Sequence, residues 1–471
     1  MILTILRLKY MSPNINFIKR IKLKLSSIAI IIVIACCLVI DMGFKNWEKP
    51  TRVIEWDIHS YYAYLPAAFI YKDIHLWKSD YRIGKNYFMF WPNYTADGKK
   101  VIKTTMGMAV LYAPFFLVGH AAAMLSEYPE NGFSEPYKIL LLVSALFYLF
   151  VGLDFLRKIL IHYKFSDIHI ASSILLIGLG TNLTAYSSQS APMSHVYSFC
   201  LFSVFIYYTI KWFESQTIKN TIIIGLLIGL ISLVRSSNII IMLFFAFYGV
   251  SSLSDFKERT LFFRKKAVLL LIIVAAFILV WVPQLVYWKI SSGSFFYYSY
   301  PDERFFFNAP KIIQGLFGFR KGWLIYTPMM AFALAGVFVL KGTMKKTQLP
   351  IILFFILNIY IIFSWWCWWY GGSFGQRSMV ESYALLAIPF ASFIKYVSEK
   401  KLLYNLMFYS AALFFIWLNL FQTLQFENMV LHYDGMSKEL YFKQFGRLEK
   451  IKDYDKYVIS PDYDEARRGN R

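Results

Sequence analysis

Cysteine and acidic residues are scarce in this sequence, and each shortage narrows the classes of protein to consider. The four cysteines match no metal-binding motif in their spacing, and three of them lie inside apolar runs, so we interpret them as packing residues. Asp and Glu number 28 against 49 Lys and Arg, which gives a net charge of +21. A basic balance is typical of nucleic-acid-binding proteins and also of the cytoplasmic loops of membrane proteins, and the apolar content favours the second class.

Ionisable residues are almost absent from the middle of the apolar runs. Asp154 lies near one end of a run, and His195, Arg235 and Glu381 lie near the opposite ends of others. Ion-coupled transporters usually hold ionisable groups or broken helices near the bilayer midplane. Because the sequence shows no such set, a transporter is disfavoured.

Apolar and aromatic residues, by contrast, are abundant, at 58% and 20%. Apolar runs of about 17 to 25 residues recur along the chain, and each is long enough to cross a bilayer as a helix. Membrane-spanning β-strands would instead give short alternating segments. The sequence therefore predicts an all-α polytopic membrane protein with about eleven transmembrane helices.

The charges between the apolar runs set the predicted topology. A basic leader, residues 1–26, is expected in the cytoplasm, because Lys and Arg collect on that side of a membrane protein. Residues 27–421 then form the transmembrane domain, with a long first outer (periplasmic) loop at 42–136, and residues 422–471 form an outer C-terminal tail. We expect the spans near 27–41, 137–158, 168–187, 195–212, 221–233, 238–253, 267–288, 323–340, 349–366, 378–394 and 402–421.

One apolar run inside the first outer loop, Met106 to Leu125, is long enough to be a further span. The charges on either side argue against this. The segment after it, 126–136, is acidic, whereas Arg157, Lys158 and Lys164 follow the next apolar run. Because positive charge marks the cytoplasmic side, we predict a surface or re-entrant helix on the outer side.

The first outer loop opens with the sequence EWDIHSYYAYLPA, which places two acids, Glu55 and Asp57, among aromatic residues. Such a segment is often a solvated loop beside an ordinary interfacial aromatic belt. The alternative is functional: a carboxylate held at the membrane surface, with Tyr61 and Tyr62 lining a substrate cavity, is the best candidate for chemistry in the chain.

Other uncommon polar residues gather in segments that are also predicted to lie outside. Several separate segments thus offer charge to one outer-face cavity, as expected of an active site assembled from loops on a helical scaffold. Besides the two acids of the first loop, the candidates are Lys103, His195, Arg235, Asp302, Glu303, Arg320, Lys321 and Arg377.

Each candidate also has a purely structural interpretation. His195 is at a helix start, where capping or packing is common, and Arg235 has the length to snorkel to the interface. Asp302 and Glu303 fit a solvated turn, and Arg320 and Lys321 fit interface anchors, although a paired cation also suits a phosphate. The functional interpretation is strongest for Arg377, which follows GGSFG, since glycines let backbone amides approach a ligand closely.

Taken together, these pieces resemble the GT-C superfamily of membrane glycosyltransferases, and most closely its protein mannosyltransferase and aminoarabinose transferase group. The likeness covers about residues 28–421. It is carried by D-x-x-x-Y-Y-x-Y at 57–64, by the surface segment 103–114 followed by Phe115 and Phe116, and by F-G-x-R at 374–377.

The resemblance implies an inverting transferase in the inner membrane that uses a polyprenyl-phosphate-linked sugar as donor, with Asp57 as the general base. The acceptor stays open between protein, lipid and glycan. In the mannosyltransferase pattern Asp and Glu are adjacent, whereas here one residue separates Glu55 from Asp57, so the role of Glu55 as a second acid is open.

The chemistry is reasonable without the family. A positioned carboxylate can remove the proton of an attacking hydroxyl, and fixed cations can stabilise a departing lipid phosphate. We assign that second role to Arg235, Arg320, Lys321 and Arg377. Since no cluster of His, Asp and Glu has clear metal-ligand spacing, we predict metal-independent activity with no cofactor, and membrane lipids rather than nucleic acid as partners.

Two other classes of function stay open from the sequence. One is a polysaccharide polymerase or ligase, or a flippase or transporter of lipid-linked sugars. A polymerase or ligase typically has its key Arg and His in a large late outer loop, whereas the longest outer loop here is the first. The other is a non-enzymatic membrane protein, in which Asp57 and Arg377 would tolerate substitution.

Overall fold

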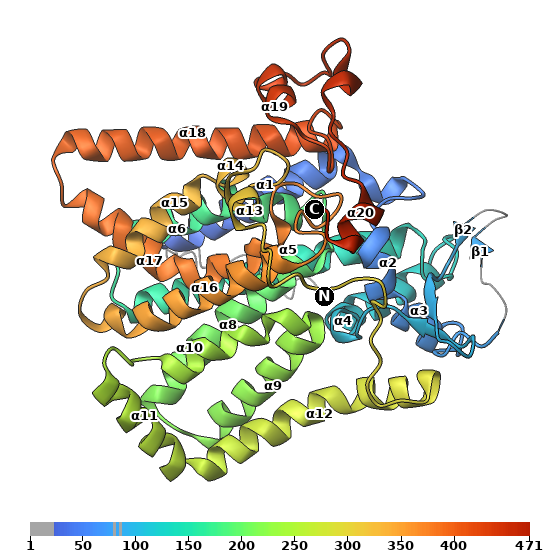
Figure 1. Cartoon of the computed structure of the whole chain (residues 1–471), viewed down its shortest axis with the longest axis horizontal. Coiled ribbons are helices and arrows are strands. Elements are labelled where there is room, and N and C mark those ends of the chain that lie inside the picture. Colours follow the sequence, from blue (N-terminus) through green and yellow to red (C-terminus); the bar gives the residue numbers. More distant parts are fainter. Residues whose placement is uncertain (1–22, 79–81, 84–86) are drawn as a thin grey trace, which may run out of the picture.

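Apolar helices make up most of the computed structural model, which describes residues 23–78, 82–83 and 87–471 (Figure 1). In the described part of the chain, eight segments are long and apolar enough to cross a membrane. They run along α1 (Leu25–Phe44), α4 (Gly107–Met124), α5 (Glu135–His162), α8 (Ser194–Glu214), α12 (Ala267–Ser292), α16 (Gln348–Ser364), η6 with α17 (Arg377–Ser382 and Tyr383–Ser398) and α18 (Leu402–Glu427).

Four shorter apolar segments complete the set. They are α6 (Asp167–Leu179), α9 (Ile218–Val234), η3 with α10 (Ser236–Ile241 and Met242–Phe247), and α15 with η4 (Met329–Gly336 and Val337–Val339). With α4 set aside, these long and short segments correspond in order to the eleven predicted spans. The all-helical polytopic fold class is therefore confirmed, whereas most of the predicted leader, residues 1–22, lies outside the described residues.

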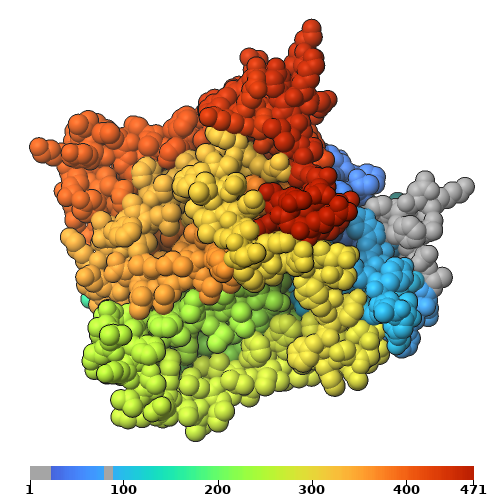
Figure 2. Space-filling model, viewed as in Figure 1, coloured from blue at the N-terminus to red at the C-terminus, as the bar shows by residue number. Residues whose placement is uncertain are grey.

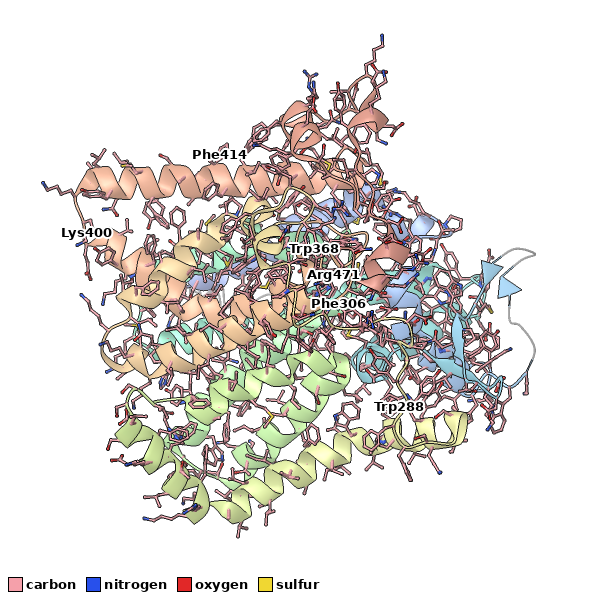
Figure 3. The ribbon with its side chains drawn as sticks, viewed as in Figure 1. Trp288, Phe306, Trp368, Lys400, Phe414 and Arg471 are labelled. Atoms are coloured by element: carbon pink, nitrogen blue, oxygen red, sulfur yellow. The ribbon has the colours of Figure 1, made fainter. Side chains whose placement is uncertain are left out.

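The two ends of the helix bundle differ in character. We name one the loop end: it carries the first loop (45–106), the segment 293–322, the segment 365–377 and the tail 428–471. We name the other the basic end, where α11 (Leu253–Lys265) and the turn at Lys400 lie. Figure 3 shows Lys400 far from Trp288, Trp368 and Arg471, which lie at the loop end.

The helix α4 does not cross the bundle. A Cβ on Gly107, at its start, would lie 2.5 Å from the backbone of Leu233 at the end of α9. A Cβ on Gly119, near its other end, would lie 3.2 Å from the Cα of Tyr137 at the start of α5. Both neighbours belong to the loop end, so α4 lies along that face. This is the surface helix that the charge pattern predicts.

The rest of the first outer loop consists of small elements, of which α2 (Trp56–Tyr62) and α3 (Tyr64–Phe69) contact α4. The others are η2 (Asn46–Glu48) and two antiparallel strand pairs, β1 (Arg82–Ile83) with β2 (Tyr87–Phe88), and β3 (Pro92–Tyr94) with β4 (Lys100–Ile102). The hydroxyl of Tyr287 accepts a hydrogen bond of 2.9 Å from the backbone N–H of Ile102, which ties this loop to the end of α12.

Two predicted spans are interrupted in the structure. The span at 168–187 divides into α6 and α7 (Leu183–Ser187), and the span at 323–340 divides into α14 (Trp323–Tyr326) and α15. The second break falls at Pro328, which has no backbone N–H to continue a helix. The basic segment 257–266 lies mostly in α11, whose start is fixed by a capping box between Ser252 and Asp255.

The C-terminal tail folds against the loop end instead of extending from it. Its elements are α19 (Lys438–Gln444), η7 (Tyr454–Tyr457) and α20 (Tyr463–Arg468). Leu431 and Leu440 of the tail share a small separate core with Tyr326 and Phe374. Figure 2 shows the red C-terminal segment seated against the yellow segment around residue 300. The short α13 (Ile312–Phe317) and η5 (Gly342–Thr347) connect the remaining spans.

Candidate active site

Asp57 lies in the first turn of α2, directly after a left-handed residue. Its neighbour Trp56 has a φ of 50°, a conformation that bulky residues rarely adopt and that costs on the order of 1 kcal/mol. A carboxylate in the first turn is favoured by the positive end of the helix dipole. Asp57 Oδ2 lies 2.9 Å from Nη1 of Arg377, and 47% of its side chain is exposed. Asp57 is thus fixed in position by Arg377 and still accessible from outside the protein.

The charges around Asp57 keep it ionised. Burial by itself raises the pKa of Asp57, but the charge and hydrogen bond of Arg377 outweigh that effect, with smaller contributions from Lys103 and Arg235. The net result is a pKa below the usual range of an aspartate. The side chain is therefore a carboxylate at neutral pH, as a proton acceptor must be.

Arg377 is positioned by the GGSFG segment that precedes it. Gly375 has a φ of +57°, and a Cβ there would lie 2.9 Å from Tyr326, so only glycine fits without displacement. Gln376 donates a hydrogen bond of 2.9 Å to the carbonyl of Trp368, which anchors the turn. Arg377 then begins η6 with 15% of its side chain exposed. Gly375 thus permits the tight turn that orients the side chain of Arg377.

A second charged group, fully enclosed, lies beside the first. Glu381, four residues after Arg377, is 3% exposed. Its Oε1 lies 3.5 Å from Nε of Arg235 and 3.3 Å from Nδ1 of His195. Arg235 ends α9, and His195 begins α8, so three separate spans meet at this carboxylate.

Tyr61 lies close to both charged groups. It projects from α2 and is 8% exposed. Burial raises the pKa of its phenol, and the groups that act on it electrostatically include Asp57, Arg235 and Arg377. Tyr62 instead turns away and donates a hydrogen bond to the carbonyl of Gly132. Of the two predicted cavity tyrosines, only Tyr61 therefore lies with the charged groups.

Lys103 and Glu303 form a third ion pair at the loop end. Lys103 Nζ lies 3.0 Å from Glu303 Oε1 and 4.7 Å from the ring centre of Tyr300. The other oxygen of Glu303 accepts a hydrogen bond of 2.9 Å from the indole N–H of Trp366. Lys103 also acts electrostatically on Asp57, which places this pair at the edge of the same site.

Four predicted site residues have other partners. Glu55 lies 3.5 Å from Arg52, which also binds Glu427 at the end of α18. Lys321 is buried and donates to the carbonyls of Ser373 and Tyr433. Arg320 donates to the carbonyl of Ile459 at 3.1 Å. Asp302 is exposed and lines a surface hollow of about 500 Å³ with α20. None of these contacts reaches Asp57, so their functional roles stay predictions.

Glu381 is the residue that sequence reasoning missed. Its position near an outer helix end was visible, but it was given no role. The available signal was a lone carboxylate that lies fourteen residues before the next charged residue, Lys395, and follows a segment with four tryptophans. Buried charges are rarely unpaired, so Glu381 itself implied that a basic partner must lie close. Its partners, His195 and Arg235, lie on other spans and could not be identified from the sequence.

The described residues contain no group of three or more His, Cys, Asp or Glu side chains placed to hold a metal ion. Metal independence stays a prediction.

Comparison with known proteins places this arrangement in a fold. No protein-family model and no curated protein matches the chain. Among solved structures, the archaeal oligosaccharyltransferase AglB from Archaeoglobus fulgidus, in complex with an inhibitory peptide and a dolichol-phosphate, matches with a TM-score of 0.50 and 13% identity over 92% of this chain. An apo oligosaccharyltransferase from Archaeoglobus fulgidus matches with a TM-score of 0.43, 12% identity and 93% coverage of this chain.

The chain spans 58% of the length of the AglB structure and 56% of the apo structure, so the whole neighbours are larger than this protein. At such low identity the likeness concerns the fold. The helical bundle, the long first loop with its surface helix and the match to AglB together show that this chain has the GT-C fold.

Proposed function

We propose that this protein is an inverting membrane glycosyltransferase, which moves a sugar from a polyprenyl-phosphate donor to a hydroxyl-bearing acceptor. The observation that carries the proposal is the pair of Asp57 and Arg377, 2.9 Å apart at the loop end of a GT-C fold. It joins an accessible carboxylate to a cation in one place. Transfer of a sugar from a lipid phosphate to a hydroxyl can use both, the carboxylate to accept the proton and the cation to stabilise the leaving phosphate.

In this proposal Asp57 is the general base. The acceptor hydroxyl attacks the anomeric carbon of the donor sugar, and its proton passes to the carboxylate of Asp57. The bond between the anomeric carbon and the phosphate oxygen breaks, and its electron pair leaves with the lipid phosphate. Attack from the side opposite the phosphate inverts the anomeric configuration.

Arg235 and Arg377 are the cations best placed to receive the growing phosphate charge. Both act electrostatically on Asp57, and both carry guanidinium groups that can bind a phosphate through two donors. Arg320 and Lys321 bind backbone carbonyls of the tail and of Ser373, so we assign them a supporting role in shaping this end of the protein.

The distribution of charge supports an orientation. The basic end holds many lysines and arginines, including those of α11, and such loops lie in the cytoplasm. The loop end with its site then faces outward from the inner membrane, with the N-terminus inside and the C-terminal tail outside. The AglB structure contains a dolichol-phosphate, a lipid of the class proposed here for the donor.

The test is transfer by purified protein in lipid, with a panel of polyprenyl-phosphate sugars and an extract that supplies acceptors. We expect wild type to consume one donor class and Asp57→Asn to lose about a thousandfold in turnover, within the range for a general base. Glu55→Gln is the matched control, because Glu55 pairs with Arg52, and we expect only a small loss.

Two outcomes would contradict the proposal. If wild type consumes no donor with the acceptor extract present, a flippase of lipid-linked sugars becomes the better explanation. If Asp57→Asn retains full turnover, the base is a different group. Excess EDTA is expected to leave turnover unchanged.

A further inference from the structure

The buried group of Glu381, Arg235 and His195 has a defined protonation pattern. Glu381 and Arg235 carry opposite charges 3.5 Å apart and neutralise each other. A third charge in a site where Glu381 and His195 are 3% and 0% exposed would be costly, so His195 is neutral. Its Nδ1 faces the carboxylate at 3.3 Å and therefore carries the proton. The remaining nitrogen, Nε2, is then a hydrogen-bond acceptor.

That acceptor is unused within the described part of the protein. His195 Nε2 is buried without a hydrogen-bond partner. Ser198 Oγ and the side-chain amide of Gln189, from the same short stretch, are in the same state, as is Nε of Arg377. Leaving a buried polar group unsatisfied costs about 1–3 kcal/mol, so these atoms call for a partner such as a bound ligand.

The geometry of α8 groups these atoms. His195 and Ser198 are three positions apart on the helix and so share a face. Ser203, further along the same helix, shows the contrast: its hydroxyl donates to the carbonyl of Phe199 at 2.9 Å. A serine in this helix can thus satisfy itself locally, and Ser198 does not.

We propose that His195 and Ser198 recognise a hydroxyl group of the donor sugar. His195 Nε2 accepts a hydrogen bond from that hydroxyl, Ser198 exchanges one with a neighbouring oxygen, and Glu381 positions His195 by binding Nδ1. This inference rests on the proposed function. Because Glu381 also binds Arg235, which we assign to the leaving phosphate, we assign the group that contacts His195 to the molecule that carries that phosphate. On this assignment the hydroxyl is that of the donor sugar, and the test below separates it from an acceptor hydroxyl.

The test measures binding without any acceptor. Purified protein in nanodiscs is titrated with bare polyprenyl phosphate and with polyprenyl phosphate carrying glucose, mannose, N-acetylglucosamine or aminoarabinose, and the readout is the ratio of affinities between sugar-bearing and bare lipid. We expect wild type to prefer its best sugar-bearing lipid at least about tenfold, as one or two hydrogen bonds allow. His195→Phe should reduce the ratio to about one without weakening binding of bare polyprenyl phosphate.

Further variants separate recognition from packing. His195→Gln carries an amide that reaches the position of Nε2, and we expect it to restore part of the ratio. Ser198→Ala should lower the ratio several-fold, whereas Ser203→Ala, the matched control, should not. A deoxy sugar that lacks the contacted hydroxyl should bind wild type and His195→Phe equally.

Each remaining outcome overturns the inference in a recognisable way. A wild type that binds bare and sugar-bearing lipids equally overturns this inference and leaves the proposed function intact. A wild type that binds no lipid phosphate overturns both. A His195→Phe variant that loses affinity for bare and sugar-bearing lipids in the same proportion shows that His195 only supports Arg235. A loss of acceptor affinity alone, in the transfer reaction, assigns the hydroxyl to the acceptor.

Discussion

Two carboxylate–arginine pairs of this protein each have one member in the same short helix and differ in how far their carboxylates are exposed. Arg377 and Glu381 both belong to η6, yet each pairs with a partner from elsewhere. The pair of Asp57 and Arg377 has a carboxylate that is 47% exposed. The pair of Glu381 and Arg235 has a carboxylate whose side chain is 3% exposed, with a histidine beside it.

The difference in exposure indicates which carboxylate can react with a substrate and which one only stabilises its neighbours. An exposed carboxylate can meet an acceptor and exchange a proton, and its pairing costs little to break. An enclosed carboxylate is reached by no substrate, and removing one member leaves an uncompensated charge in a medium that solvates it poorly. We therefore assign chemistry to Asp57 and Arg377, and we assign to Glu381 the positioning of Arg235 and His195.

Among the variants that test this comparison, Arg377→Gln should have the largest effect, because it breaks the exposed pair and removes a cation from the phosphate. We expect turnover to fall by about 100- to 1000-fold, the usual result of losing one charge-stabilising donor. The acidic limb of the pH profile should also move to higher pH. Arg377 holds the pKa of Asp57 down, so without it the carboxylate is protonated, and activity lost, at a higher pH.

The measurement is kcat/KM against pH for wild type and variant. Arg304→Gln is the matched control, because Arg304 is an exposed arginine of the same end that packs on Phe306, and we expect no shift of the limb. An unshifted limb in Arg377→Gln would mean that Asp57 is not the group that titrates in the profile.

The next effect should fall on stability and so sharpen the comparison. Glu381→Gln keeps the shape of the side chain but leaves Arg235 without its counter-charge, and we expect the free energy of unfolding to fall by about 3 kcal/mol. Asp57→Asn should lower it by only about 1 kcal/mol, because that carboxylate is half exposed.

Thermal unfolding of both variants in the same detergent checks this expectation. Equal losses of stability would remove the distinction between the two pairs, and a stable but inactive Glu381→Gln would move Glu381 into the reacting group.

The last effect concerns Lys321, a buried amine whose hydrogen-bond partners are carbonyls. Burial lowers the pKa of Lys321 from 10.5 to about 7. Between these values the unfolded chain holds a proton that the folded chain has lost, so stability rises with pH in that window. We expect wild type to gain up to about 1.4 kcal/mol per pH unit relative to Lys321→Met between pH 7 and 10.

Unfolding free energies of the two proteins across that pH range give the test. Lys438→Met removes an exposed lysine of the tail and should show the same slope as wild type. Equal slopes for wild type and Lys321→Met would show that Lys321 keeps its proton in the folded protein, held by the two carbonyls.

Much of the fold was predictable because it depends on local properties. Run length and hydrophobicity mark a span, and loop charge marks a side, so eleven segments and the surface helix α4 followed from the sequence. The breaks at α7 and α15 did not follow, because an apolar run reads as continuous even where the backbone turns. The folding of the tail over Phe374 was equally out of reach, since its core residues are far apart in the chain.

The candidate site was also predictable only in its local properties. The identities of Asp57, Arg235, His195 and Arg377 as unusual polar residues at one end of the bundle came from the sequence by itself, because a charged side chain beside an apolar run is conspicuous. Which of them pair, and which are enclosed, was decided only by tertiary structure. Ion pairs depend on distances between spans separated by a hundred residues or more, and burial depends on what packs over a side chain, and neither quantity is a property of local sequence.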